Sequence, residues 1–143
     1  MDEVDKKIVE ILRDDSRTTF SQIARDLGIS DVAVYKRVKK LQDEGIIKRF
    51  TLVIDPRAMG REVIAYVLMK TLANHTIPIA ERLREEEWVS EIYTLVGEYD
   101  IIAKVETSSI QSLKEFVERR LRNMEGILDL RTSIVFTVFK ENI

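Results

Sequence analysis

Hydrophobic residues recur with a helical period in the first third of the chain and with a strand-like period beyond it. The first part predicts three helices, over Asp2–Asp14, Thr19–Leu27 and Asp31–Glu44. In the third helix Val34, Val38 and Leu41 occupy the i, i+4 and i+7 positions of one buried face. Gly28 suits the turn before it, because glycine readily adopts the left-handed conformation that ends a helix.

The second and third helices together have the features of a helix-turn-helix. Ser30 can cap the third helix by accepting from backbone N–H groups of its first turn. Val32, Lys36 and Lys39 are rotated away from the buried face, so the outer surface of this helix is basic. Such a helix fits the major groove of DNA. A helical hairpin whose lysines are merely solvated is the alternative.

Charge distribution favours DNA over the plain hairpin. Four of the five residues from Lys36 to Lys40 are basic, although the chain as a whole carries a formal net charge of −2. We expect double-stranded DNA as the partner, with Ser21, Gln22 and Arg37 on its backbone and four residues of the third helix outermost. The complete predicted DNA-binding set is Ser21, Gln22, Ser30, Val32, Tyr35, Lys36, Arg37, Lys39 and Lys40.

Beyond Gly45 the sequence changes character. Ile46–Ile54 is rich in strand-forming residues and predicts a short wing or the first strand of a linker. Asp55-Pro56-Arg57 and Gly60 then interrupt the pattern, as turn residues do. We therefore predict a helix-turn-helix domain over residues 1–55 and a second domain over residues 61–143.

The second domain is predicted to contain a strand-helix-strand unit, a tight turn, and a second strand-helix-strand unit. Its predicted strands are Val63–Thr71, Glu91–Val96, Ile101–Glu106 and Ile127–Phe139. One helix is expected from Thr76 to Glu87, and the other from Ser108 or Ser109 to Met124. The predicted fold class is α+β, with an N-terminal winged-helix-like helix-turn-helix domain and a C-terminal ferredoxin-like βαββαβ domain.

The first and last of these strands are apolar on both faces, whereas both helices of a ferredoxin-like fold cover the same face of the sheet. The other face therefore needs a partner, most simply the same face of a second chain. This predicts a homodimer held by residues 61–143.

Composition narrows the remaining possibilities. The 143 residues include no cysteine and a single histidine, His75, in a polar Asn-His-Thr loop without neighbouring catalytic partners. We therefore expect neither an enzyme nor a metal site. No apolar stretch approaches the length that spans a membrane, so a cytoplasmic protein is expected.

Several short motifs, taken in order, resemble those of the Lrp/AsnC family of transcriptional regulators. They include Asp5-Lys6-Lys7-Ile8, Leu27-Gly28-Ile29-Ser30, Val38-Lys39-Lys40-Leu41, Asp55-Pro56 and Gly97-Glu98-Tyr99-Asp100. The resemblance covers essentially the whole chain. It implies a DNA-binding regulator that assembles as a dimer, or as a tetramer or octamer of dimers. An effector-independent protein that coats DNA is the alternative function.

The same resemblance implies a small effector, usually an amino acid, bound between C-terminal domains, and no other cofactor. Gly97, Tyr99 and Asp100 match the loop that is central to the family's effector pocket. On the last strand Thr132 fills a position where amino-acid-binding members carry a hydroxyl, whereas Leu130 stands where another hydroxyl is common. This departure leaves a nonpolar amino acid, or no effector at all, as alternatives. The predicted effector site is therefore Gly97, Tyr99, Asp100, Leu130 and Thr132.

Overall fold

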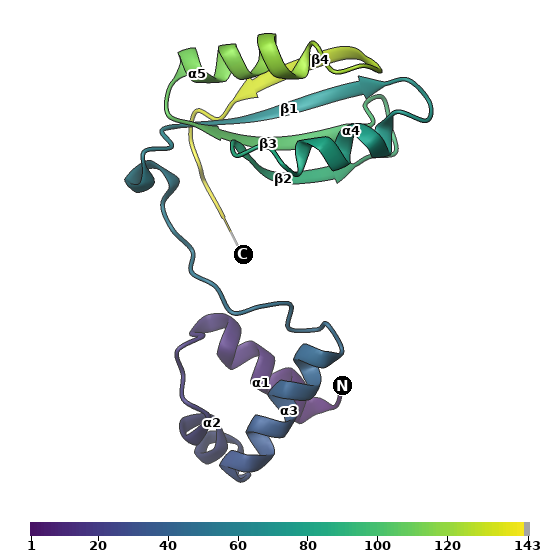
Figure 1. The fold of residues 1–143 in the computed structure, drawn as a ribbon. Coiled ribbons are helices and arrows are strands. Elements are labelled where there is room, and N and C mark those ends of the chain that lie inside the picture. The colour runs from purple at the N-terminus through teal and green to yellow at the C-terminus, as the bar shows by residue number, and fades with distance from the viewer. Residues whose placement is uncertain (142–143) are drawn as a thin grey trace. The chain divides into compact units, whose positions relative to one another are not determined.

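The computed structural model describes residues 1–141 and divides the chain into two compact units, Met1–Leu52 and Val53–Ile143 (Figure 1). The first unit is helical and the second contains the sheet. This is the mixed helical and antiparallel fold that the sequence predicts.

The first unit contains three helices whose ends follow from local capping. They are α1 (Glu3–Asp14), α2 (Phe20–Leu27) and α3 (Asp31–Asp43). Thr19 caps α2 through the N–H of Gln22, and Ser30 caps α3 through the N–H of Ala33. Gly28 has a φ of +66°, which confirms the predicted left-handed turn between α2 and α3.

The apolar faces of these helices meet in one small core. Val34, Val38 and Leu41 of α3 are all buried, as predicted. The first two pack with side chains of α1 and α2, namely Ile8, Leu12, Ile23 and Ala24. The opposite face of α3 is thereby left exposed.

Residues 46–54 form no strand, so the predicted wing or linker strand is absent from the part of the chain that the structure describes. Ile46 and Ile47 instead donate their N–H groups to the carbonyl of Leu41 and end the helix. The next residues have strand propensity, but a strand requires a hydrogen-bonded neighbour. Leu52 and Val53, 77% and 70% exposed, have none here.

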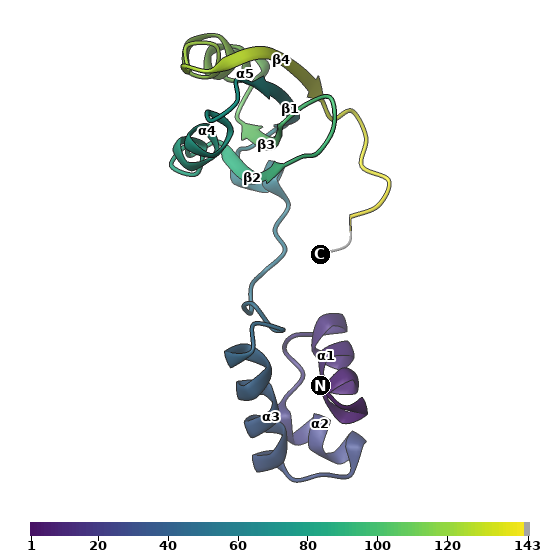
Figure 2. The same ribbon diagram turned by 90° about the vertical axis from the view of Figure 1, so that its right-hand side faces the viewer.

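The second unit is a four-stranded antiparallel sheet in the order β2-β3-β1-β4. Its strands are β1 (Val63–Thr71), β2 (Val89–Thr94), β3 (Ile101–Thr107) and β4 (Ile127–Ile134). Its helical segments are the short 3-10 turn η1 (Pro56–Met59), α4 (Thr76–Leu83), α5 (Ile110–Glu115) and the π-helical continuation η2 (Phe116–Leu121). Figure 2 shows α4 and α5 on the same side of the sheet. The order and pairing are those of the ferredoxin-like fold.

Strand register gives the sheet two distinct faces. On β1 the side chains of Ala65, Val67 and Met69 are fully buried under the helices. The alternate residues, Ile64, Tyr66, Leu68 and Lys70, define the face without helices, which we call the open face. Residues paired directly across an antiparallel ladder share a face. The open face therefore also contains Ile102 and Lys104 of β3, and Asp129, Arg131 and Ser133 of β4.

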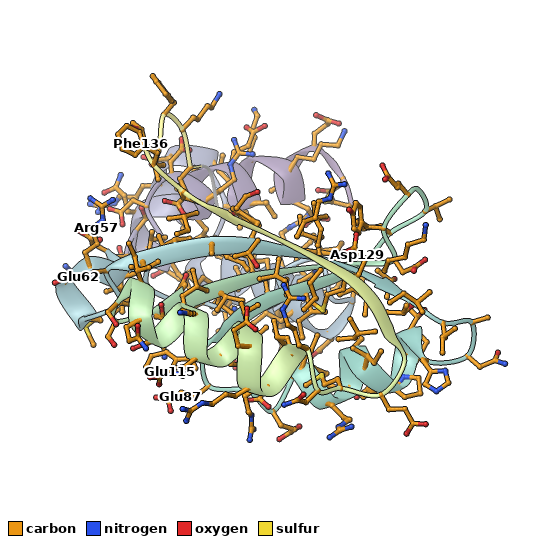
Figure 3. All side chains as sticks on the ribbon, turned by 90° about the horizontal axis from the view of Figure 1, so that it is seen from above. Arg57, Glu62, Glu87, Glu115, Asp129 and Phe136 are labelled. Atoms are coloured by element: carbon orange, nitrogen blue, oxygen red, sulfur yellow. The ribbon has the colours of Figure 1, made fainter. Side chains whose placement is uncertain are left out.

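Several predicted elements end earlier than expected. The helix predicted to reach Met124 ends at Leu121, and the strand predicted over Glu91–Val96 is observed over Val89–Thr94. α4 ends at Leu83, and the hydroxyl of Thr76 does not cap it but shares a 2.6 Å hydrogen bond with that of Thr71. β4 ends at Ile134 and not at Phe139, because its partner β1 begins at Val63. The chain then leaves the sheet, and Phe136 is 95% exposed on this C-terminal segment (Figure 3).

Candidate DNA-binding and effector sites

The outer face of α3 presents an exposed, basic and partly apolar surface. Val32 and Tyr35 are 61% and 56% exposed, and the side chains of Lys36, Lys39 and Lys40 are exposed as well. The ammonium groups of the last two lie 3.9 and 3.7 Å from carboxylates four residues further along the helix. Such exposed pairs are weak, so both lysines are available to phosphates.

Two predicted contact residues support the helix-turn-helix itself. The Ser21 hydroxyl of α2 donates to the carboxylate of Asp31, which joins α2 to the first turn of α3. The Ser30 hydroxyl accepts from the N–H of Ala33 at 3.1 Å. Both hydroxyls therefore have partners within the unit and fix the turn.

Gln22 belongs to a row of polar side chains along the exposed surface of α2. Its amide nitrogen donates to Asp26 at 2.7 Å, and its carbonyl oxygen accepts from Arg25 at 2.8 Å. These bonds are exposed and local to α2, so the amide remains reachable by a partner.

Arg37 is placed differently from the lysines around it. Its Nη1 atom donates to Asp2 and to Asp5 of the α1 N-terminus, at 2.7 Å in both cases. Hydrogen bonds from backbone N–H groups at the start of α1, followed by that from Arg37, lower the pKa of Asp2 to about 2. The same two kinds of bond lower the pKa of Asp5. The guanidinium that sequence reasoning assigned to the DNA backbone thus belongs to a cluster inside the unit.

In the second unit the loop between β2 and β3 is closed by Asp100. Its backbone carbonyl accepts from the N–H of Leu95, and its own N–H donates to Met69, at 2.8 and 2.9 Å. Its Oδ2 accepts from the N–H of Thr71 at 2.8 Å and from the hydroxyl of Thr71 at 3.3 Å. Asp100 therefore anchors the loop to the end of β1, and Oδ1 is the oxygen without such a contact among the described residues.

Tyr99 lies against two charged residues of β4. Its hydroxyl donates to Oδ2 of Asp129 at 3.3 Å, and the guanidinium carbon of Arg131 lies 5.7 Å from the centre of its ring. Asp129 lies on β4, as Figure 3 shows. Burial is the largest factor that raises the pKa of Tyr99. An aromatic ring, an anion and a cation are thus grouped at the edge of the open face.

The register separates Leu130 and Thr132 from this group. Leu130 pairs with Met69, and Thr132 with Val67, so both side chains belong to the helix-covered side. Leu130 packs against the core, while Thr132 is exposed at the edge strand. Within one chain Tyr99 therefore lies beside Asp129 and Arg131, and not beside Leu130 and Thr132.

Gly97 is not required by the geometry of its own loop. Its φ lies outside the left-handed region, and a Cβ added there would meet nothing within 4 Å. Within one chain a larger residue would fit at this position. The empty space beside Gly97 is therefore available to a ligand or to a second chain.

Three clefts of about 500, 380 and 410 Å³ lie in the second unit. The first runs between α4 and the edge strand β2, the second lies under the segment after β4, and the third lies beside Trp88 and η2. None of the five predicted effector residues lines these clefts. Among residues 1–141 no group of His, Asp and Glu side chains is arranged to hold a metal ion, and no helix has the length and apolarity to cross a membrane.

Sequence comparison decides the family of this two-unit chain. Residues 1–42 match the AsnC-type helix-turn-helix domain, and residues 64–143 match the Lrp/AsnC ligand binding domain. The chain belongs to the Lrp/AsnC family. Members of this family are transcriptional regulators, not enzymes, and this protein is a DNA-binding regulator of that type.

Lrp/AsnC relatives match over nearly the full length. The HTH-type transcriptional regulator FL11 of Pyrococcus furiosus is 33% identical over 141 residues, which are 99% of this chain and 93% of that protein. The regulator LysM of Sulfurisphaera tokodaii is 37% identical over 142 residues, with 97% of each chain covered. Escherichia coli AsnC has a TM-score of 0.93 at 25% identity and covers 100% of this chain and 97% of its own.

Asp129 and Arg131 are charged residues beside Tyr99 that the predicted effector set does not include. Alternation along β4 was the available signal, because side chains of a strand point alternately to its two faces. Leu130 and Thr132, which stay a prediction, lie on the face that the helices cover. The contacts of Tyr99 with Asp129 and Arg131, formed only in the folded unit, show which alternate set lies beside it.

Proposed function

We propose that α3 reads the major groove of double-stranded DNA, with Val32, Tyr35, Lys36 and Lys39 as the contacting residues. The exposure of these four side chains on one face, opposite the buried face of the same helix, carries this assignment. Lysine contacts with phosphates supply affinity, whereas Val32 and Tyr35 are placed to meet base edges. The expected result is a sequence-specific regulator.

Nuclease footprinting of the full chain with a random-sequence competitor tests this function. We expect discrete protected sites that persist in excess competitor, with two half-sites about 10 base pairs, or a multiple of that, from centre to centre. Uniform protection that the competitor removes would instead support the alternative of a protein that coats DNA.

The second unit is proposed to assemble as a homodimer through the open face. Further association of such dimers would use other surfaces. The centre of the open face is apolar and half-exposed, with Ile64 and Leu68 on β1 and Ile102 on β3. A face of this kind is costly to leave in water, and the same face of a second chain related by a two-fold axis would cover it.

An amino-acid effector is proposed to bind beside Tyr99, at a boundary between chains. Arg131 and Asp129 offer one charge each for the carboxylate and the ammonium of a zwitterion, and Tyr99 offers an aromatic surface. The space beside Gly97 leaves room for a ligand. A Neisseria meningitidis regulator solved with L-Met, with a TM-score of 0.91 and 22% identity over 99% of this chain and 94% of its own, has the same fold.

A thermal-shift screen of the twenty amino acids is expected to give stabilisation by one or a few of them. A ligand present at about 100 times its Kd adds roughly 2.7 kcal/mol to the free energy of unfolding, which corresponds to several degrees in Tm.

Arg131→Gln should remove this shift. Arg122→Gln, at an exposed arginine of the same unit, is the control and should keep it. Asp100→Asn retains an oxygen for Thr71, so it tests the charge of Asp100 without opening the loop. An undiminished shift in Arg131→Gln would exclude this location.

A further inference from the structure

A cluster of three charged side chains joins the first helix of the DNA-binding unit to α3. Arg37 donates through one nitrogen to Asp2 and Asp5, and these two residues also accept from each other's backbone N–H at 2.9 and 2.8 Å. The Asp5 side chain is only 5% exposed, that of Arg37 is 32% exposed, and that of Asp2 is 55% exposed. Each carboxylate therefore both caps α1 and holds the guanidinium.

The position of Arg37 on α3 explains what this cluster can do. It immediately precedes Val38 and lies one turn from Val34 and Leu41, so it flanks the buried face and points toward α1. Lys39 lies on the far side of the helix from Arg37, and Lys36, the preceding residue, lies about 100° around the axis from it. The core between α1 and α3 is apolar, and apolar packing has little directionality. Charge-assisted hydrogen bonds have strict geometry, so the cluster fixes the rotation of α3 about its own axis.

The same geometry argues against a phosphate as the partner of Arg37. Moving the guanidinium to DNA would leave the Asp5 carboxylate buried and without its cation, which is a strongly unfavourable state. The exposed carboxylate of Asp2 would in addition repel a phosphate placed beside Arg37. We therefore expect the internal ion pairs to be retained when DNA binds.

We propose that Asp5 and Arg37, assisted by Asp2, are positioning residues for DNA recognition: they orient α3 and set DNA affinity without touching DNA. This inference rests on the proposed role of the outer face of α3. It assigns a function in binding to an acidic residue of α1. It also makes a prediction of opposite sign to simple electrostatics, because removing an acidic residue near DNA would otherwise strengthen binding.

The test measures DNA affinity of the full chain at several salt concentrations for Asp5→Asn, Arg37→Met and the double variant. The probe is DNA selected by the wild-type protein from a random pool. We expect each single substitution to weaken binding about tenfold. The double variant should bind about as well as the more affected single variant, because the effects of residues in one network do not add. The slope of log Kd against log salt should stay at the wild-type value in all three, since no phosphate contact is lost.

Glu3→Gln is the matched control, because Glu3 lies in the same turn of α1 and pairs with exposed Lys6 but not with α3. It should leave affinity unchanged. Asp2→Asn is a second test variant in which the helix cap is kept, since asparagine caps as well as aspartate. It should weaken binding about threefold, with the wild-type slope. Circular dichroism and Tm establish that each variant is folded at the assay temperature, so reduced affinity reports on folded protein.

Three results would overturn the inference. Wild-type or tighter binding by Asp5→Asn and Asp2→Asn would show that these residues do not orient α3. A slope lowered by about 0.9 in Arg37→Met alone would identify Arg37 as a phosphate contact. Multiplying losses in the double variant would mean independent roles. Failure of the proposed DNA surface has a separate sign, which is unchanged affinity when Lys36 and Lys39 are replaced by alanine. The failure of this inference and the failure of the proposed function can therefore be told apart.

Discussion

Replacing Lys36 and Lys39 together by alanine is expected to weaken DNA binding about a hundredfold at moderate salt. Both side chains are exposed on the outer face of α3, and Lys39 has only a 3.9 Å contact with a carboxylate to lose. Each phosphate contact contributes about 0.9 to the slope of log Kd against log salt. The double variant should therefore lower this slope by about 1.8, and fluorescence anisotropy over a range of KCl concentrations measures both quantities.

Lys6→Ala with Lys7→Ala is the matched control for total charge. These two lysines are exposed on α1, in the same unit but outside α3. Their removal should change affinity less than threefold, because only non-specific attraction is reduced. Equal losses in the two double variants would indicate a diffuse charge effect, and wild-type affinity in the Lys36 and Lys39 variant would exclude the outer face of α3 from the DNA interface.

The helices of the DNA-binding unit could be predicted because their signals are local. Ser30 as a cap, Gly28 with positive φ, and the buried set Val34, Val38 and Leu41 each depend on residues at most one or two turns away. Arg37 could not be assigned in this way. Its partners Asp2 and Asp5 lie more than thirty residues earlier in the sequence, and only the packing of α1 on α3 brings them together.

Strand formation was less predictable because it depends on partners. Val63–Thr71 has the predicted bounds, since β3 and β4 flank it on both sides. Residues 46–54 have similar propensity but find no partner strand in the described chain, so they stay outside any sheet. The same dependence on pairing placed Leu130 and Thr132 on the helix-covered side, whereas Asp129 and Arg131 accompany Tyr99.

The open face of the sheet is apolar at Ile64, Leu68 and Ile102, but on β4 it is polar, with Asp129, Arg131 and Ser133, where the sequence predicted an apolar face. Beneath the helices the core is complete, with Ala65, Val67 and Met69 fully buried. On the other side Lys104 lies among carboxylates, 3.5 Å from Glu91 and 3.7 Å from Glu106. Although burial lowers the pKa of Lys104, the neighbouring carboxylates raise it further, so the net shift is upward. A satisfied ionic network next to apolar residues suits a surface that a second chain covers.

Leu68→Arg is therefore expected to convert the assembly to monomers. Leu68 is half-exposed at the centre of the open face and pairs with Ile102 and Arg131 across the neighbouring strands. Arginine there adds a charge beside Arg131 and buries it against a second chain, which is unfavourable without a partner anion. The monomer itself should fold, because this face is outside its core.

Ile77→Arg, at an exposed apolar residue of α4, is the control and should leave the assembly intact. Analytical ultracentrifugation measures the mass directly, and an unchanged sedimentation coefficient in Leu68→Arg would place the dimer contact elsewhere. DNA affinity should fall with the loss of assembly, because one helix-turn-helix engages only one half-site.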